Sequence, residues 1–208
     1  MTATFINSFI LFFVTIDTIG NLPFFLSLTE GAKIKKRNQK ALKSIIIVFF
    51  IMITFAYLGR YLLEAIHVSL DSLKIAGGVI LMFLAIDILF EKRKIRREKR
   101  VEEALDEKNF EEIIVFPIAF PFIAGPSALT TIILLIGNYT NFPEFQVPVI
   151  LALVAALIVS LVLMIGANFI IKYIPQQILH ATSRVMAFIL AALATQFIID
   201  GIKASFNI

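Results

Sequence analysis

Six apolar runs, each long enough to cross a bilayer, organise this chain of 208 residues. A hydrocarbon core of about 30 Å is crossed by about 20 apolar residues in an α-helix. The runs cover residues 5–29, 41–63, 70–90, 112–138, 147–171 and 182–202. Only 16% of the residues are charged, whereas soluble domains carry about a quarter. The sequence therefore predicts an all-α membrane protein with six transmembrane helices.

The positive charges predict how these helices are oriented. Sixteen of the 19 Lys and Arg residues lie in or beside the first, third and fifth connections, and the other three are Arg60, Lys74 and Lys203. Connections rich in Lys and Arg stay in the cytoplasm. We therefore expect a multi-pass protein of the cytoplasmic (inner) membrane with both termini on the extracytoplasmic side.

A charged segment divides the chain into two similar parts. Residues 91–111 mix acids with bases and are expected to form a cytoplasmic linker between residues 1–90 and 112–208. Each part holds three apolar runs, so the second part enters the membrane from the opposite face. This arrangement is the 3+3 inverted-topology repeat found in many secondary transporters.

Glycine and proline interrupt the first and fourth runs near their centres. In the first run, Gly20 and Pro23 predict that the helical ladder opens between Asp17 and Pro23. In the fourth run, Pro121 and Pro126 predict a second break. Non-helical backbone at membrane depth persists only where protein buries it or where it lines a cavity. The first and fourth helices are therefore expected to be discontinuous and to form a site.

The breaks suggest a site for a zwitterion. A helix that restarts after a break presents unpaired amides and the positive end of its dipole, which bind anions such as a carboxylate. Asp17, the only acid expected deep in the membrane, could meet an ammonium group, a sodium ion or a proton. The candidate substrate-binding residues are Asp17, Gly20, Asn21, Gly125, Ser127, Ala128 and Thr130.

These residues also have a structural interpretation. Asp17 could cap the amides of Ile19 or Gly20, and Asn21, Ser127 and Thr130 could cap other backbone groups freed by the breaks.

Several other functions are not expected. The chain has no cysteine, and its two histidines fall on opposite sides of the membrane, so no metal site is predicted. Ser127 has no base at its depth, which argues against an enzyme. The basic segment 92–97 favours contact with anionic lipids rather than nucleic acid. A channel for ions or small solutes, or an exporter of another metabolite, remains the alternative to an amino-acid carrier.

The chain resembles the MarC family of membrane proteins. The resemblance rests on FVTIDTIGNLPFFLSLT at 13–29, KIAGG at 74–78, FPFIAGPSALTT at 120–131 and QFIIDG at 196–201. It implies six spans, external termini and transport of small neutral amino acids such as glycine and alanine. The family usually has proline after the aspartate, where this chain has Thr18. No cofactor is expected, the coupling ion could be a proton or sodium, and both the direction of transport and a homo-oligomer are left open.

Overall fold

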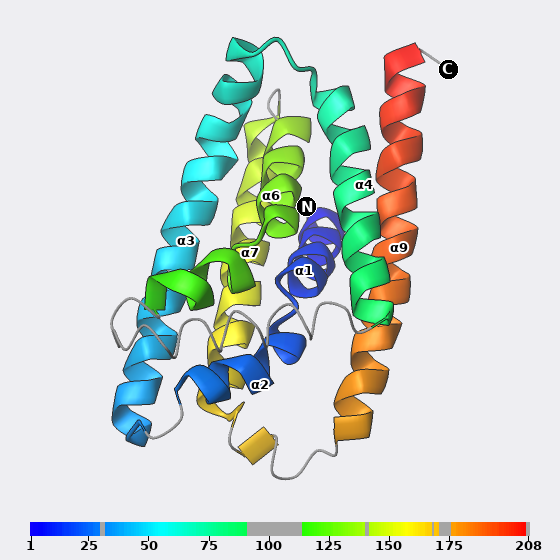
Figure 1. The fold of residues 1–208 in the computed structure, drawn as a ribbon. Helices are drawn as coiled ribbons and strands as arrows, with labels where there is room; N and C mark the ends of the chain where they lie inside the picture. Colours follow the sequence, from blue (N-terminus) through cyan, green and yellow to red (C-terminus); the bar gives the residue numbers. More distant parts are fainter. Residues whose placement is uncertain (30–31, 91–113, 140–141, 168, 171–175, 207–208) are drawn as a thin grey trace.

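The computed structural model describes residues 1–29, 32–90, 114–139, 142–167, 169–170 and 176–206, and all regular secondary structure in these ranges is helical (Figure 1). The elements are α1 (Thr2–Ile16), α2 (Thr18–Leu28), α3 (Ile34–Ala65), α4 (Leu70–Leu89), the π-helix η1 (Ile114–Ile123), α6 (Pro126–Asn138), α7 (Pro143–Ile165) and α9 (Gln176–Phe206). The expected linker at 91–111 lies outside the described residues.

Five of the described helical segments are long and apolar enough to cross a membrane. They are Thr2–Leu28, which combines α1 and α2, then Ile34–Ala65, Leu70–Leu89, Pro143–Ile165 and Ala181–Phe206. The expected fourth run consists of η1 and the shorter apolar helix α6, which are separated at Ala124 and Gly125. These elements define a multi-pass integral membrane protein.

Helices α4 and α9 lie side by side along one flank of the protein (Figure 1). Gly78 of α4 faces α9 so closely that a Cβ atom there would lie 2.7 Å from the carbonyl oxygen of Ala194. Gly201 of α9 faces α4 in the same way, with the carbonyl oxygen of Asp71 at 2.9 Å. Small residues let membrane helices approach this closely.

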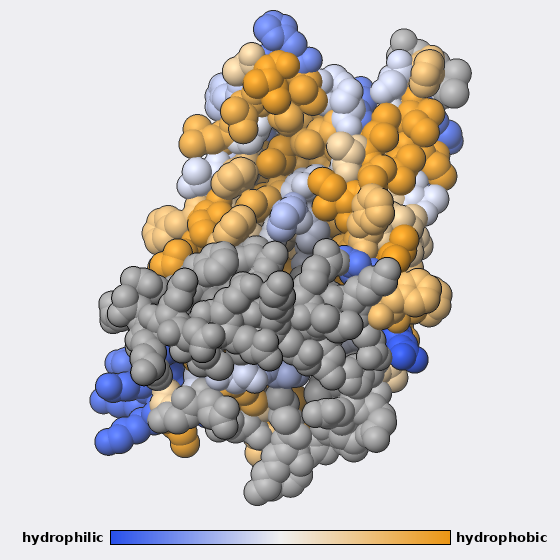
Figure 2. All heavy atoms as spheres, viewed as in Figure 1, coloured by the Kyte–Doolittle hydropathy of each residue, from blue (hydrophilic) through white to orange (hydrophobic). Residues whose placement is uncertain are grey.

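The remaining helices enclose the main core. One cluster of buried side chains joins α1, α2, α3, η1, α6 and α7, and a smaller one joins α1, α4 and α9. Many large apolar side chains on the outside are exposed, and Figure 2 shows them along the flanks. An apolar exterior of this kind is suited to lipid, while the hydrophilic patch at the lower left of Figure 2 marks the start of α3.

The first break is shorter than the sequence predicted. The chain leaves the helix at one residue, Asp17, and α2 starts immediately at Thr18. The expectation that Pro23 breaks the helix is wrong, because Pro23 lies inside α2 as its sixth residue. Its missing N–H removes only the hydrogen bond that the Ile19 carbonyl would accept. Pro121 lies within η1, and Pro126 is the first residue of α6.

Candidate functional site

Asp17 forms the junction between α1 and α2. Its backbone is left-handed, with φ 49° and ψ 53°, and its N–H donates to the Phe13 carbonyl at 3.2 Å. Aspartate is one of the few residues other than glycine that visit this region readily. The Asp17 side chain turns back over α2 and accepts a hydrogen bond from the Gly20 N–H at 3.3 Å. The carboxylate therefore caps α2, which is one of the two roles considered from the sequence.

Gly20 makes room for this carboxylate. A Cβ atom at position 20 would lie 2.4 Å from Oδ2 of Asp17 and 2.8 Å from Oδ1. Any larger residue would displace the Asp17 side chain. The requirement for glycine is thus steric, since position 20 has helical backbone within α2.

Asn21 connects the two interrupted segments. Its Nδ2 donates to the Ile16 carbonyl at 2.9 Å and to the Phe122 carbonyl at 3.1 Å. Ile16 ends α1, and Phe122 lies at the end of η1, so one side chain satisfies backbone carbonyls at both breaks. Asn21 is 5% exposed, and its Oδ1 has no hydrogen-bond partner among the described residues.

The second break follows from the unusual ladder of η1. The Ala124 N–H donates to the Ala119 carbonyl at 2.9 Å, the longer step of a π-helix, and Gly125 is extended with ψ 169°. Proline-rich backbone favours this irregularity because proline has no N–H to donate. Helix α6 then begins, and its first turn closes when the Leu129 N–H donates to the Gly125 carbonyl.

The second and third residues of α6 are buried, whereas the first, Pro126, is exposed. Ser127 and Ala128 precede the first intrahelical hydrogen bond, and the described part of the chain records no acceptor for their amides. Ser127 is 5% exposed and Ala128 is fully buried. The Thr130 hydroxyl donates to the Pro126 carbonyl at 2.9 Å, so its hydrogen atom is already used in a bond within α6. The amides, not the Thr130 hydroxyl, are the donors free for an anion.

An aromatic contact holds the two interrupted segments together beside Asn21. The rings of Phe24 in α2 and Phe122 in η1 meet edge to face, with centroids 6.0 Å apart. The structure thus brings Asn21 to the end of η1, immediately before Gly125.

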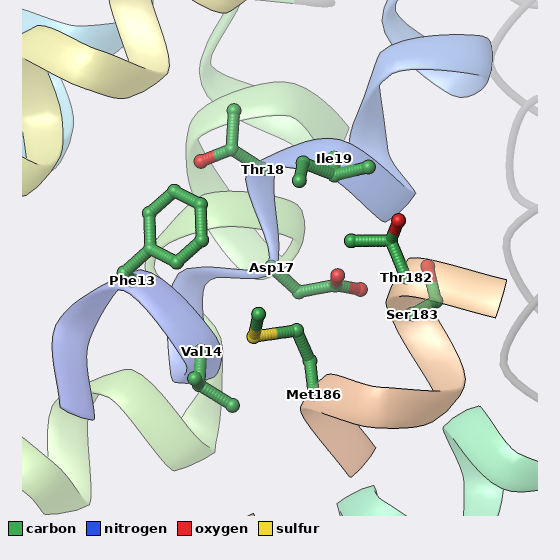
Figure 3. A pocket seen from close by; sticks show the side chains of 8 residues that line it. All are labelled: Phe13, Val14, Asp17, Thr18, Ile19, Thr182, Ser183 and Met186. Carbon is green, nitrogen blue, oxygen red and sulfur yellow. The ribbon is translucent and has the colours of Figure 1, made fainter. Parts of the chain in front are cut away.

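Asp17 itself faces a different neighbour. Figure 3 shows its carboxylate directed towards Thr182 and Ser183 of α9, across a hollow of about 240 Å³ including its open mouth. The lining residues are Phe13, Val14, Asp17, Thr18, Ile19, Thr182, Ser183 and Met186. None of them belongs to η1 or α6, so this hollow is separate from the contact between Asn21 and Phe122.

Sequence reasoning missed the contribution of α9. The only local signal is the pair of hydroxyl residues Thr182 and Ser183 at the start of the sixth apolar run. It also missed Thr18, whose hydroxyl forms a short hydrogen bond with that of Ser160 in α7. This bond fastens the start of α2 to α7.

The described helices and the sequence comparisons both indicate a membrane protein. The features above define a multi-pass integral membrane protein whose buried polar groups gather at two helix interruptions. The chain belongs to the MarC family of integral membrane proteins, whose family model matches residues 2–206. The resemblance inferred from the sequence motifs is confirmed.

Relatives match along nearly their whole length. A UPF0056 membrane protein of Methanocaldococcus jannaschii is 32% identical over 203 residues, covering 98% of this chain and 88% of the relative. A UPF0056 membrane protein of Archaeoglobus fulgidus is 35% identical over 201 residues, with 95% and 92% covered. The UPF0056 membrane protein YvbG of Bacillus subtilis is 27% identical, with 100% and 98% covered. No solved structure matches the chain.

Proposed function

We propose that this protein carries small neutral amino acids, such as glycine and alanine, across the cytoplasmic membrane by alternating access. The observation that carries the proposal is the bridge from Asn21 to the carbonyls of Ile16 and Phe122. It brings the polar backbone of two interrupted segments together in the protein interior, which is where secondary transporters bind their substrates.

The two ends of a zwitterion find complementary groups at this junction. The carboxylate binds the amides of Ser127 and Ala128 at the start of α6, where the helix dipole is positive. The ammonium group donates to Oδ1 of Asn21, which has no other partner in the described structure. Asp17 supplies negative charge in the neighbouring hollow, which faces α9.

Small residues around the second break limit the size of the substrate. Gly125 and Ala128 are buried where a substrate side chain would lie, and Ala124 before them is also fully buried. A glycine or alanine molecule adds little volume at this point, whereas a large side chain would require the core to open further. The preference for small neutral amino acids follows from this packing.

The pattern of helix contacts supports a 3+3 inverted repeat. If residues 1–90 and 112–208 are structural copies, α1 corresponds to η1, α2 to α6, α3 to α7 and α4 to α9. Helix α1 then contacts α7 as η1 contacts α3, and α2 contacts α7 as α6 contacts α3. The contact of α4 with α6 likewise corresponds to that of α9 with α2. On this account the protein has six spans and external termini.

Transport requires the junction to open. Asn21 and Ser127 are each 5% exposed, so a solute reaches them only after the segments separate. The hydrogen bond from Asn21 to Phe122 and the ring contact from Phe24 to Phe122 belong to the closed conformation. Movement of α2 against η1 then exposes the binding groups alternately to the two sides of the membrane.

Uptake of radiolabelled glycine and alanine into proteoliposomes tests the proposal. We expect saturable uptake that unlabelled alanine inhibits and that a bulky amino acid such as tryptophan leaves unchanged. Sodium and proton gradients applied separately identify the coupling ion. Absence of amino-acid-specific flux would reject the carrier. Ion currents larger than a carrier can turn over would instead identify the channel alternative.

A further inference from the structure

We propose that the contact between Thr18 and Ser160 is a fixed pivot, about which helix α2 turns when the junction at Asn21 opens. The part that this pivot plays in transport rests on the proposed function, whereas the pivot itself does not. Thr18 is then a positioning residue, because it acts on the solute site through the angle of α2 and not by touching the solute.

Two hydroxyl groups in series fasten the start of α2 to α7. The Ser160 hydroxyl donates to the Ala156 carbonyl at 2.8 Å, so its hydrogen atom is already used within α7. Its oxygen is therefore the acceptor in the short bond with Thr18, and the Thr18 hydroxyl is the donor. Figure 3 shows this hydroxyl directed away from the Asp17 carboxylate. Thr18 and Ser160 are both buried, so breaking the bond would leave a donor without water to replace its partner.

Helix α7 offers a fixed surface for this anchor. It is one continuous helix, Pro143–Ile165, and it contacts both α1 and α2. Ala152, Ala156 and Ser160 follow one another at intervals of four residues, and all three are almost fully buried. Small residues at this spacing let a neighbouring helix approach closely. The start of α2 is thus held by close packing as well as by the hydrogen bond.

The backbone immediately before Thr18 has the form of a hinge. Asp17 alone joins α1 to α2, with φ 49° and ψ 53°. The Asn21 N–H donates to the Asp17 carbonyl at 3.1 Å, so the first turn of α2 is closed from its first residue. Hinges are formed by a few residues at the ends of rigid elements, which absorb the change in φ and ψ. A change in the Asp17 dihedral angles would therefore turn α2 as a unit.

Distance from the pivot decides which contacts open. At 1.5 Å per residue, Phe24 lies about 9 Å along the helix from Thr18, and Leu28 lies about 15 Å from it. The contacts described there are apolar, since the Phe24 ring meets that of Phe122 and Leu28 is buried in the main core. Apolar contacts are not directional and can slide. A small rotation therefore separates α2 from η1 at Phe24 and leaves Thr18 in place.

Two pairs of thiols along the same helix test the pivot with opposite expected results. Thr18→Cys with Ser160→Cys places two sulfur atoms where hydroxyl groups are now in contact, in a chain that has no other cysteine. We expect linking these thiols to preserve or raise glycine uptake relative to the reduced protein, because the link replaces the lost anchor. Linking Phe24→Cys to Phe122→Cys should stop uptake. If linking positions 18 and 160 stops the uptake that the reduced protein shows, the contact moves and the pivot is rejected.

Substitution of the hydroxyl groups gives a second test. Thr18→Val and Ser160→Ala remove the bond and should lower the maximal rate of uptake by about tenfold, whereas Thr18→Ser keeps the donor and should retain the rate. Thr15→Val is the matched control, because Thr15 is equally buried and its described hydroxyl bond, at 2.8 Å to the Leu11 carbonyl, stays within α1. Full retention of uptake by both Thr18→Val and Ser160→Ala would overturn the pivot.

Pulsed electron paramagnetic resonance on the full chain in lipid nanodiscs tests the pivot without any solute. One spin label is placed at Val147, an exposed position of α7, and the other at Ser27 or at Ile19, which lie near the two ends of α2. We expect a wider distribution of distances for the label at position 27 than for the label at position 19. Adding Thr18→Val should widen the distribution for position 19.

The outcomes separate the pivot from the carrier. Equal widths for positions 19 and 27 would overturn the pivot even in a protein that transports glycine. A wide distribution at position 27 and a narrow one at position 19, in a protein without amino-acid flux, would support the pivot and reject the carrier.

Discussion

The side-chain nitrogen of Asn21 and the carbonyl oxygen of Phe122 lie 3.1 Å apart, although 101 positions separate the two residues in the chain. The same nitrogen also holds the Ile16 carbonyl at 2.9 Å. One amide therefore satisfies the carbonyls left at the ends of two different helices. In lipid, where water is absent, backbone carbonyls depend on protein donors of this kind.

Asn21→Asp tests this bridge, because the two side chains have nearly the same shape. The carboxylate has no hydrogen to donate, so both carbonyls lose the Asn21 donor and face negative charge. We expect a loss of about 1–3 kcal/mol in stability and a loss of uptake, measured by thermal unfolding and flux. Asn7→Asp, at an exposed position of α1, is the control and should change neither. Wild-type stability of Asn21→Asp would show that the bridge is unimportant.

Substitutions of Asp17 separate its backbone role from its charge. Glycine and asparagine both tolerate the left-handed backbone, whereas alanine does not. We therefore expect Asp17→Ala to lower the free energy of unfolding by about 1–2 kcal/mol. Asp17→Asn should therefore fold normally and transport poorly. Unfolding and uptake are measured for the three variants, with Asp200→Asn at an exposed position of α9 as the control. If Asp17→Asn transports like the wild type, the carboxylate acts only as a cap.

Gly20→Ala should reduce function without weakening α2. Alanine favours a helix interior over glycine by about 1 kcal/mol, but its Cβ would lie 2.4 Å from Oδ2 of Asp17. The carboxylate must move, so we expect uptake to fall while the helix content in circular dichroism is preserved. The clash is absent when Gly20→Ala is combined with Asp17→Gly. If Gly20→Ala lowered the stability of the Asp17→Gly variant, the steric explanation would be contradicted.

The α4–α9 contact predicts a different response to added methyl groups. Gly78→Ala and Gly201→Ala should each destabilise the protein by about 1–3 kcal/mol, because the new atom meets backbone of the facing helix. Ala76→Leu, at an exposed position of α4, should have little effect because its side chain faces lipid. Thermal unfolding of the three variants distinguishes these positions, and equal tolerance would mean that the two helices are farther apart.

The sequence pattern predicted the helical class and the neighbourhood of both interruptions because glycine and proline act on their own backbone. The sequence did not predict that the first break would consist of Asp17 alone. A left-handed aspartate has no unique signature, and Pro23 was accommodated inside α2 instead of ending a helix.

The partners of the candidate site were beyond the reach of local patterns. Neither the contact of Asn21 with Phe122 nor the position of Thr182 and Ser183 opposite Asp17 follows from spacing along the chain. Both depend on how separate helices rotate about their axes and pack. A helix that is apolar on all sides does not specify which face meets a neighbour.

The central claim is that the two interrupted segments meet when closed and separate during transport. The chain has no cysteine, so Phe24→Cys and Phe122→Cys can be introduced together as the only thiols. The most direct measurement is glycine uptake by this double variant after the two thiols are linked, and again after reduction. The account predicts that linking stops uptake and that reduction restores it. Undiminished uptake by the linked protein would contradict the account.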